Sequence, residues 1–528
     1  MTSPKNILNA LNTDALLQIF EYLWPDGGLR PLSMTCWSMR EATMLVLFSH
    51  CEVLVKAPVS TDRFIPRSLW PYVRKLTLID KCPDLDAMSD SPRELKFTSD
   101  PLLCGTMSAT FLKDALRAMP RLRSVCLDMY AQEVHGIGWD SLAAVLSTPQ
   151  LRTFTVETFL FSPREAPSET WVDTLAPITT FRYDRPSFRS CLRAYPSQQD
   201  TLAFVLTHLH RSLESLLLPS EITPVAVLSQ IQWPQLRELS LSGEFHPSAG
   251  YVAPFVSLFS GMSRLRVLNL ALALPPGVHR KQLMLWPEGY ESQLPWPDLE
   301  ALTVSFPDPE DGIFSRLPLS LRRLSLRCTP HHCLRLWERN QYLCYRSPIL
   351  HASEMLEVLT KLSAPLLDSL QLEYRANDAD DDLLRCISDK FPNVRSLEVQ
   401  RFLASCNDTI SVANIGRRLA PLRSLHTLRA HFQLPDSMTI RPPPRQEYPE
   451  VDERYYEGSV EELCQTAAVL RNVLPQSDVG LWLLEREDCG GRWRLFRRAI
   501  KQDGDQAQGP REELDPAGDW GISVYAFE

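Results

Sequence analysis

Glycine is scarce in this sequence, and the common phosphate-binding and hydrolase motifs are missing. Only 20 of the 528 residues are glycine, about 4% against a usual share of about 7%. The sequence contains no Walker-type loop, GxGxxG fingerprint, GxSxG elbow or HExxH helix, the motifs that position phosphates, nucleophiles or zinc. We therefore expect a chain that is not an enzyme, with no catalytic residue and no cofactor.

Long apolar runs are also missing. No stretch approaches the roughly 18 uncharged apolar residues that would cross a membrane, and the richest, ATMLVLFSHCEVLV, is interrupted by His50 and Glu52. The first residues lack the basic segment and unbroken apolar core of a signal peptide. The 13 cysteines are odd in number and scattered without a framework, which is typical of reduced thiols. These features favour a location in the cytoplasm or nucleus and no membrane partner.

The charge balance lacks a basic excess. Lys and Arg total 55 and Asp and Glu total 64, giving a net charge of −9. Because a nucleic-acid footprint needs a basic stripe, we expect no nucleic-acid partner.

One cluster has residues of the kind that bind metal: Cys328, His331, His332 and Cys333. Zinc sites usually show a second pair of ligands at short spacing, and Cys344 has no nearby mate. We therefore expect no metal, and interpret the cluster as a loop with buried thiols. The alternative of a cryptic hydrolase rests on this cluster alone.

Proline, by contrast, is abundant, with 42 residues in a chain that is 44% hydrophobic. So much apolar side chain excludes a disordered polymer, so the prolines must belong to a folded structure. A hexamer recurs, with apolar residues at its first, fourth and sixth positions. Its copies are VRKLTL from Val73, LRSVCL from Leu122, LRTFTV from Leu151, LESLLL from Leu213, LRELSL from Leu236, LRVLNL from Leu265, LEALTV from Leu299, LRRLSL from Leu321, LDSLQL from Leu367 and VRSLEV from Val394, with weaker copies ITTFRY from Ile178 and LHTLRA from Leu425.

Proline marks the entrance of most of these units. It stands two residues before the hexamer in seven copies: Pro71, Pro120, Pro149, Pro234, Pro297, Pro365 and Pro392. Helix-like stretches such as FLKDALRAM, SLAAVLST and DDLLRCISDKF precede three of them. Proline disfavours helical geometry at the preceding residue and cannot continue a helix. We therefore expect each unit to form a helix that ends at the proline, followed by a short strand.

These hexamers resemble the strand segment of leucine-rich repeats, over roughly residues 70 to 435. The Asn or Cys usual after the strand is mostly absent, so the resemblance implies an irregular array. The fold class we expect is α/β, a leucine-rich-repeat solenoid of short parallel strands with outer helices, over 52–435. The alternative is a mixed α/β protein whose strands happen to be rich in leucine.

The first 50 residues differ in kind, because their apolar residues have helical spacing. Residues 8–51 predict three short helices, separated by the breaker at Trp24-Pro25-Asp26-Gly27-Gly28. LNTDALLQIFEYL and LRPLSMTCWSMREATMLVLF resemble the two halves of an F-box. Asn12 stands where that family generally has proline, and Trp37 lies one or two places from the usual aromatic. An F-box followed by leucine-rich repeats is a recurring domain order, and the LxxLSxTC core with irregular proline-led repeats looks most like fungal F-box proteins.

The resemblance implies docking to a Skp-family adaptor and, through it, to a cullin–RING ubiquitin ligase. The residues that would carry adaptor binding are Leu11, Leu16, Ile19, Phe20, Leu23, Leu29, Leu32 and Cys36. The alternative for this module is a plain helical cap over the first repeat, since a solenoid needs its open end covered.

The variable positions of the hexamers alternate with the core positions, so they should lie on the concave face of the array. They include Cys126 as well as the residues that we expect to bind a target protein, which are Asp128, Glu157, Arg182, Asn269, Arg323, Arg327, Gln371 and Glu398. The alternative is a merely solvated sheet face.

After the repeats, residues 436–460 predict a Pro-rich charged insertion and 461–500 a capping segment, in which VGLWLLERED and RWRLFRRAI could form a strand pair. Residues 501–528 predict a polar, mobile tail.

Together these patterns favour a substrate-receptor subunit of an SCF-type ubiquitin ligase that holds an unknown protein substrate. The alternative is a repeat scaffold for protein–protein interaction without ligase coupling.

Overall fold

The computed structural model describes most of the chain in separate stretches. They are residues 12–24, 27–55, 64–80, 109–129, 139–157, 175–184, 196–244, 254–274, 279–329, 331, 348–403, 411–432, 449–475, 479–487, 490–497 and 511–513. The chain divides into two compact units. The first comprises residues 1–185, 194–218 and 222–227, and the second 186–193, 219–221 and 228–528.

The first unit begins with three short helices, α1 (Thr13–Leu23), α2 (Leu29–Ser33) and α3 (Trp37–Leu47). The Asn12 side chain caps α1 by accepting a hydrogen bond from the Ala15 N–H at 2.7 Å, which satisfies one free donor of the first turn. Gly27, with φ of +68°, forms the turn between α1 and α2, a backbone conformation that favours glycine.

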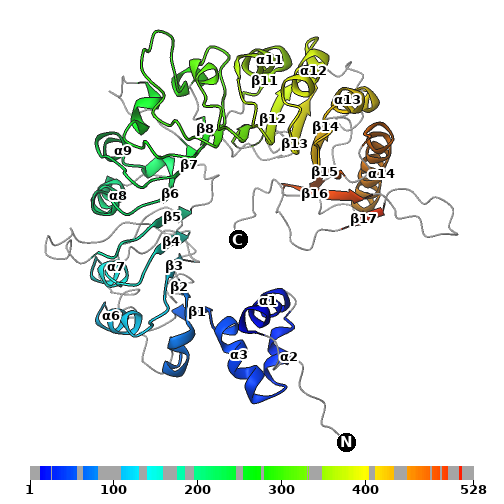
Figure 1. Ribbon diagram of the computed structural model, residues 1–528. Helices are drawn as coiled ribbons and strands as arrows, with labels where there is room; N and C mark the ends of the chain where they lie inside the picture. The colour runs from blue at the N-terminus through cyan, green and yellow to red at the C-terminus, as the bar shows by residue number, and fades with distance from the viewer. Residues whose placement is uncertain are drawn as a thin grey trace, which may run out of the picture. The chain divides into compact units, whose positions relative to one another are not determined.

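Six parallel strands follow in the first unit, each hydrogen-bonded to the next. They are β1 (His50–Val55), β2 (Lys75–Asp80), β3 (Ser124–Met129), β4 (Thr153–Glu157), β5 (Thr180–Asp184) and β6 (Ser215–Pro219). The connections hold η3 (Arg67–Tyr72), α6 (Ala109–Arg117), α7 (Trp139–Leu146) and α8 (Pro196–Leu209). In Figure 1, α6, α7 and α8 lie on one side of these strands. The residues that alternate toward the helices form buried rows across the sheet, such as Leu78, Leu127, Val156 and Tyr183.

The second unit continues the same plan. Its parallel ladder contains β7 (Glu238–Glu244), β8 (Val267–Ala273), β9 (Ala301–Val304), β10 (Arg323–Leu326), β12 (Ser369–Arg375), β13 (Ser396–Phe402), β14 (Thr427–Phe432) and β15 (Gly480–Glu487). The short strand β11 (Leu350–His351) pairs with the end of β12. Helices α11 (Ala352–Lys361), α12 (Asp380–Lys390), α13 (Val412–Leu419) and α14 (Pro449–Val473) lie on one side of β12 to β15 (Figure 1).

Single turns of 3-10 helix replace the helices between β7 and β10. They are η6 (Phe255–Phe259), η7 (Arg280–Leu283) and η8 (Gly312–Ser315), while η5 (Ser220–Ile222) and the short α9 (Val225–Gln230) precede β7. The sequence between these strands contains prolines such as Pro254, Pro297, Pro307 and Pro309, and proline lacks the N–H that a continuing helix needs.

The twelve predicted repeat strands are confirmed. Every hexamer forms a strand, and each strand begins at the third residue of its hexamer. The predicted helices before Pro120, Pro149 and Pro392 are confirmed as α6, α7 and α12. At Pro71, however, the proline lies inside the 3-10 turn η3 and does not follow a helix. The fold is α/β, a leucine-rich-repeat solenoid.

Several predicted boundaries need correction. The strand β1 begins at His50, two residues before the predicted start of the array at 52, and β15 extends the parallel ladder beyond 435. The helix α14 crosses the boundary placed between 460 and 461, because Pro449 occupies its first turn, where proline is tolerated, and no further proline interrupts it before Val473. Residues 433–448 lie outside the described residues.

The C-terminal strands also refine the prediction. The expected strand pair is confirmed as β15 and β16 (Gly490–Arg497), which are antiparallel. Within 501–528, which we predicted to be mobile throughout, Arg511–Glu513 forms β17 and pairs with β16. In the described parts of the chain, none of the helices has the length and apolar character needed to span a membrane.

Candidate protein-binding surfaces

The three N-terminal helices pack around a small apolar core. Phe20, Leu29 and Met39 are almost fully buried, with exposed fractions of 1%, 1% and 3%. Partly buried apolar side chains from all three helices surround them, namely Leu16, Leu17, Leu32, Ala42, Val46 and Leu47. The assignment of Phe20 and Leu29 as adaptor contacts is therefore corrected. Helical spacing selects the residues that the helices bury against one another, so these two hold the module together and do not present a surface.

A different set of apolar side chains on this module is exposed, and we call it the N-terminal apolar surface. It consists of Ile19, Tyr22, Trp24, Met34 and Trp37. Tyr22, Met34 and Trp37 are 80%, 75% and 76% exposed. In the described parts of the chain nine large apolar side chains are exposed, and five of them belong to this set. Five exposed large apolar side chains in so short a module make it our candidate for partner binding.

The sequence-based prediction captures this surface only in part. Of the eight predicted adaptor residues, Ile19 belongs to the exposed set, Cys36 is also exposed, and Leu16, Leu23 and Leu32 are half-buried. Leu11 lies outside the described residues. Tyr22 could have been found from its spacing, since it lies three residues after Ile19 and shares its side of α1.

The repeat strands present a second surface on their side away from the helices, which we call the helix-free face. In the first unit it carries Asp128 on β3 and Glu157 on β4, paired in register, and Arg182 on β5. Asp128 and Glu157 are half-buried and Arg182 is exposed. Cys126, expected here, is instead buried, and burial raises the pKa of its thiol to about 12, with the Glu157 carboxylate acting in the same direction. The thiol therefore stays protonated at neutral pH.

In the second unit one register row runs across eight strands of this face. Its members are Ser240, Asn269, Thr303, Ser325, Gln371, Glu398, Arg429 and Trp482. Asn269 donates a hydrogen bond from Nδ2 to the Ser240 hydroxyl at 3.0 Å. Arg323, two residues before Ser325, is exposed. Arg327, two residues after it, is half-buried.

Three of the predicted target-binding residues meet in one network around the buried Glu398. The Glu398 Oε1 accepts hydrogen bonds from Arg327 Nη1 at 2.7 Å and from Gln400 Nε2 at 2.8 Å, and its Oε2 accepts one from Gln371 Nε2 at 3.4 Å. Although burial raises it, the pKa of Glu398 is lowered overall, mainly by the Arg327 charge and the Gln400 hydrogen bond. Glu398 is therefore ionised and already neutralised within the fold.

The neighbouring carboxylate Glu373 binds the loop that follows β10. Its Oε2 accepts from the Cys328 N–H at 2.8 Å and lies 3.3 Å from His331 Nδ1. Cys328 is buried, and His332 and Cys333 of the ligand-like cluster lie outside the described residues. Among the residues that the structure describes, no group of three or more His, Cys, Asp or Glu side chains is placed to hold a metal ion.

An aromatic cluster, which sequence reasoning missed, occupies the helix-free face of β13 to β16. The Arg429 guanidinium lies over the rings of Trp482 and Trp493, at 5.5 and 5.9 Å from their centres. His431 packs against Phe402 at 5.4 Å between ring centres. The cluster forms only because the registers of β13, β14, β15 and β16 bring these residues together.

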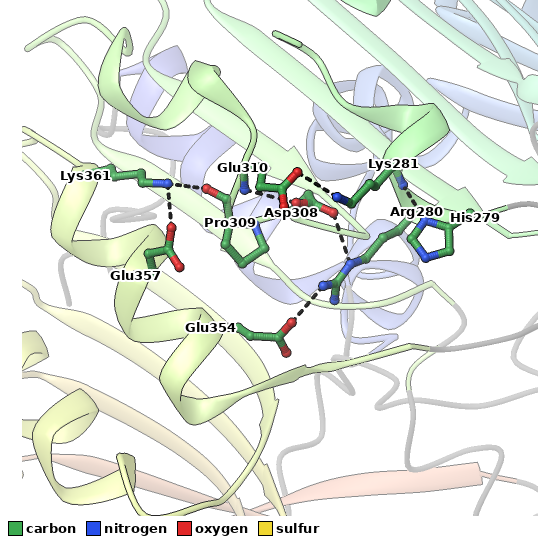
Figure 2. Close-up of polar contacts among 9 residues, drawn as sticks. All are labelled: His279, Arg280, Lys281, Asp308, Pro309, Glu310, Glu354, Glu357 and Lys361. Atoms are coloured by element: carbon green, nitrogen blue, oxygen red, sulfur yellow. Dashed lines mark hydrogen bonds and ion pairs between the residues drawn. The ribbon is translucent and has the colours of Figure 1, made fainter. Parts of the chain in front are cut away.

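An ion-pair network fixes the connection after β9 (Figure 2). Arg280 donates to Asp308 Oδ2 at 3.1 Å and to Glu354 Oε1 at 2.7 Å, so it ties the turn η7 to this connection and to α11. Although burial lowers it, the pKa of Arg280 is raised overall by Glu354 and Asp308. Figure 2 also shows Lys281 paired with Glu310, and Lys361 reaching both Glu357 and the Pro309 carbonyl. Each cation in the figure meets an acid, so we interpret this network as support for β9 and β10.

Comparisons with known proteins add one structural likeness. No family model and no curated protein matches the chain. A solved structure of the leucine-rich repeat-containing protein LegL7 from Legionella pneumophila is similar over 70% of this chain and 97% of its own, with 14% identity and a TM-score of 0.28. At that TM-score the fold must be judged from the strands themselves. Their parallel ladder, repeated hexamers and one-sided helices decide it. This is a leucine-rich-repeat fold.

Proposed function

We propose that this chain is the substrate-receptor subunit of an SCF-type ubiquitin ligase. The three N-terminal helices bind a Skp-family adaptor, which links the chain to the cullin–RING enzyme, and the helix-free face of the repeats binds a target protein. The chain itself carries out no chemistry and acts in the cytoplasm or nucleus. The observation that carries the proposal is the N-terminal apolar surface, which lies on the helices whose sequence resembles an F-box.

The repeat fold supports the second half of this proposal. Stacked repeats provide an extended surface, and folds of this type are generally binding scaffolds. The predicted target-binding residues Asp128, Glu157 and Arg182 lie on adjacent strands of one face, as a protein-binding surface requires.

Co-purification of the full chain with a recombinant Skp-family adaptor tests the proposal. We expect the double substitution Ile19→Asp and Trp37→Asp to weaken adaptor binding at least about tenfold, because truncating or charging exposed aromatic anchors removes most of an interface's binding energy. Leu319→Asp is the matched control, since Leu319 is an exposed apolar residue of the repeats.

The outcomes separate clearly. Binding by wild type and by Leu319→Asp, with loss in the double variant and an unchanged circular dichroism spectrum, supports the proposal. Failure of the wild-type chain to bind the adaptor while its repeats are folded would overturn it. Phe20→Asp is unsuitable here, because Phe20 is in the core of the module and a charge there would unfold the helices.

The second candidate is a repeat scaffold without ligase coupling, and Asn12 favours it. In place of the proline that the F-box family generally has, Asn12 uses its side chain to cap α1. A capping side chain serves helix stability whether or not an adaptor binds. The same co-purification of the wild-type chain distinguishes the scaffold from the receptor.

A further inference from the structure

The first strand of the repeat ladder has one open edge. β1 pairs with β2 through its other edge, in parallel and in register from His50–Lys75 to Val55–Asp80. Among the described residues, no hydrogen bond joins the outer edge of β1 to another segment. The apolar core of the three N-terminal helices includes no residue of β1. This edge is therefore available to a further strand.

The backbone groups along this edge belong to His50, Glu52 and Leu54. The Ser49 carbonyl accepts a hydrogen bond from the Lys75 N–H at 2.8 Å, so it points toward β2. The N–H and C=O of one residue point to the same side of a strand, and successive residues alternate between the two sides. Every second residue after Ser49 therefore bonds to β2, and the three residues between them direct their N–H and C=O groups to the open edge.

The same three residues place their side chains on the helix-free face. They alternate with Val53, which is 5% exposed and pairs in register with the buried Leu78. His50, Glu52 and Leu54 are exposed, Leu54 to 49%. A strand added at this edge would lie beside an accessible carboxylate and an accessible leucine.

Glu52 carries the only charge among the side chains of β1 at neutral pH. Burial lowers the pKa of His50, and the positive charges of Lys75 and Arg74 act in the same direction, so the imidazole is neutral. The register neighbour of Glu52 on β2 is the uncharged Thr77, and no described residue forms an ion pair with Glu52. A cationic side chain opposite Glu52 therefore gains an ion pair without breaking one.

A segment of another protein fits this edge better than a second copy of the chain. The antiparallel pairing of two β1 strands that uses all three edge residues is centred on Glu52. It places the two Glu52 carboxylates directly opposite each other, and like charges in that position are destabilising. A segment with a basic residue at the centre has the opposite effect.

We propose that the open edge of β1 binds an extended segment of a protein partner as an added strand, with a basic side chain beside Glu52 and an apolar one beside Leu54. Backbone hydrogen bonds to His50, Glu52 and Leu54 supply affinity, and the side-chain pairs supply specificity. The inference goes beyond the proposed function, because strand addition requires only the repeats. It holds for a scaffold as well as for a ligase receptor.

Fluorescence anisotropy with the full chain tests this inference. The probe is a fluorescein-labelled peptide with the central sequence Leu-Val-Lys-Val-Leu, which presents its lysine to Glu52 in either strand direction. A second probe has Glu in place of Lys. Two isomers of the first probe carry N-methyl groups, one on the Leu and Lys residues and the other on the Val residues. The variants are Glu52→Lys and the matched control Glu214→Lys, at an exposed position before β6.

We expect the wild-type chain to prefer the Lys probe to the Glu probe by about fivefold, the size of an opposite-charge pair across two strands. Glu52→Lys should invert this preference, and Glu214→Lys should keep it, both with an unchanged circular dichroism spectrum. One methylated isomer should lose at least about tenfold in affinity while the other binds as the parent probe. The reason is that a strand presents the N–H groups of alternate residues to each side.

Several results would overturn the inference. They are no binding of the Lys probe by the folded wild-type chain, an unchanged preference in Glu52→Lys, or equal affinities of the two methylated isomers. A wild-type dimer in sedimentation velocity that dissociates in Glu52→Pro would assign the edge to a second copy and overturn the inference as well. Proline at this position removes an N–H on the open edge and leaves the pairing with β2 in place.

Discussion

At the scale of single residues, Gly243 shows how closely the repeat strands are built. This glycine lies near the end of β7 with φ of +108°. A Cβ added there would lie 2.5 Å from Glu221 Oε1, the atom that accepts a hydrogen bond from the Glu244 N–H at 2.7 Å. The backbone conformation favours glycine at this position, and a Cβ here would displace the Glu221 carboxylate from its hydrogen bond to the Glu244 N–H.

We expect Gly243→Ala to destabilise the chain more than Gly289→Ala. Gly289 also has a positive φ, of +77°, but nothing lies within 4 Å of its added Cβ. Its substitution should therefore cost only the backbone strain, about 1–2 kcal/mol, whereas Gly243→Ala adds displacement of Glu221. Urea unfolding of both variants measures the difference, and equal losses would contradict a steric role for Glu221.

At the scale of single elements, β13 places a carboxylate where a binding face would be expected to expose it. Glu398 is 2% exposed, and Arg327, Gln371 and Gln400 supply its hydrogen bonds. Since its pKa is lower in the folded chain than in the unfolded chain, the ionised form favours folding. This stabilisation is present above the unfolded-state pKa and is lost as the pH falls through the folded-state value.

Glu398→Gln should therefore lower the free energy of unfolding at neutral pH by about 1.5–3 kcal/mol, the contribution of hydrogen bonds to a charged group. The difference from wild type should shrink as the pH falls below about 4.3, the unperturbed pKa of a glutamate. Urea unfolding at several pH values measures this. Glu214→Gln, at an exposed position, is the control, and a difference that does not change with pH would contradict the role of the charge.

At the scale of the whole molecule, each repeat strand pairs in register with the strands beside it. Leu324 of β10 is almost fully buried and pairs with Leu302 of β9 and Leu370 of β12. In such arrays each repeat depends mainly on the repeats beside it. A defect should therefore weaken the neighbouring strands and leave the helices of the N-terminal module, which belong to the other unit, unaffected.

Leu324→Ala should cost about 2–5 kcal/mol locally, as expected for a large-to-small change in a core. Hydrogen exchange measured by mass spectrometry should show faster exchange in β9, β10 and β12, with α1, α2 and α3 unchanged. Faster exchange throughout the chain would instead indicate a single cooperative unit.

The fold was predictable from the sequence where the apolar pattern lies within a few neighbouring residues. The binding surfaces were predictable only where they follow from that same pattern. Each hexamer predicts its strand because apolar alternation is contained within six residues. The strand β1 was missed as a repeat because Cys51 occupies the register position that Leu76 holds in β2. Similarly, α14 was divided because the prolines at 442–444 suggested an insertion that continues to 460.

The candidate binding surfaces depend on which side chains are buried and on how the strands pair, and amino-acid composition contains neither. Helical spacing identified Phe20, which is buried, and missed Trp37, which is exposed, because periodicity detects the side that a helix hides. Arg429 and Trp493 lie 64 positions apart in the sequence and meet only through the pairing of β14 with β15 and of β15 with β16.

The antiparallel pairing of β16 with β15 also ends the parallel ladder of the repeats. A parallel ladder of repeats has an open hydrogen-bonding edge, which can recruit another chain and begin aggregation. Here β16 folds back and takes the far edge of β15, and the three residues of β17 then pair with only part of β16. Deletion of β16 and β17 would uncover the far edge of β15, a strand that already continues the parallel ladder of the repeats, and would favour association of chains through that edge.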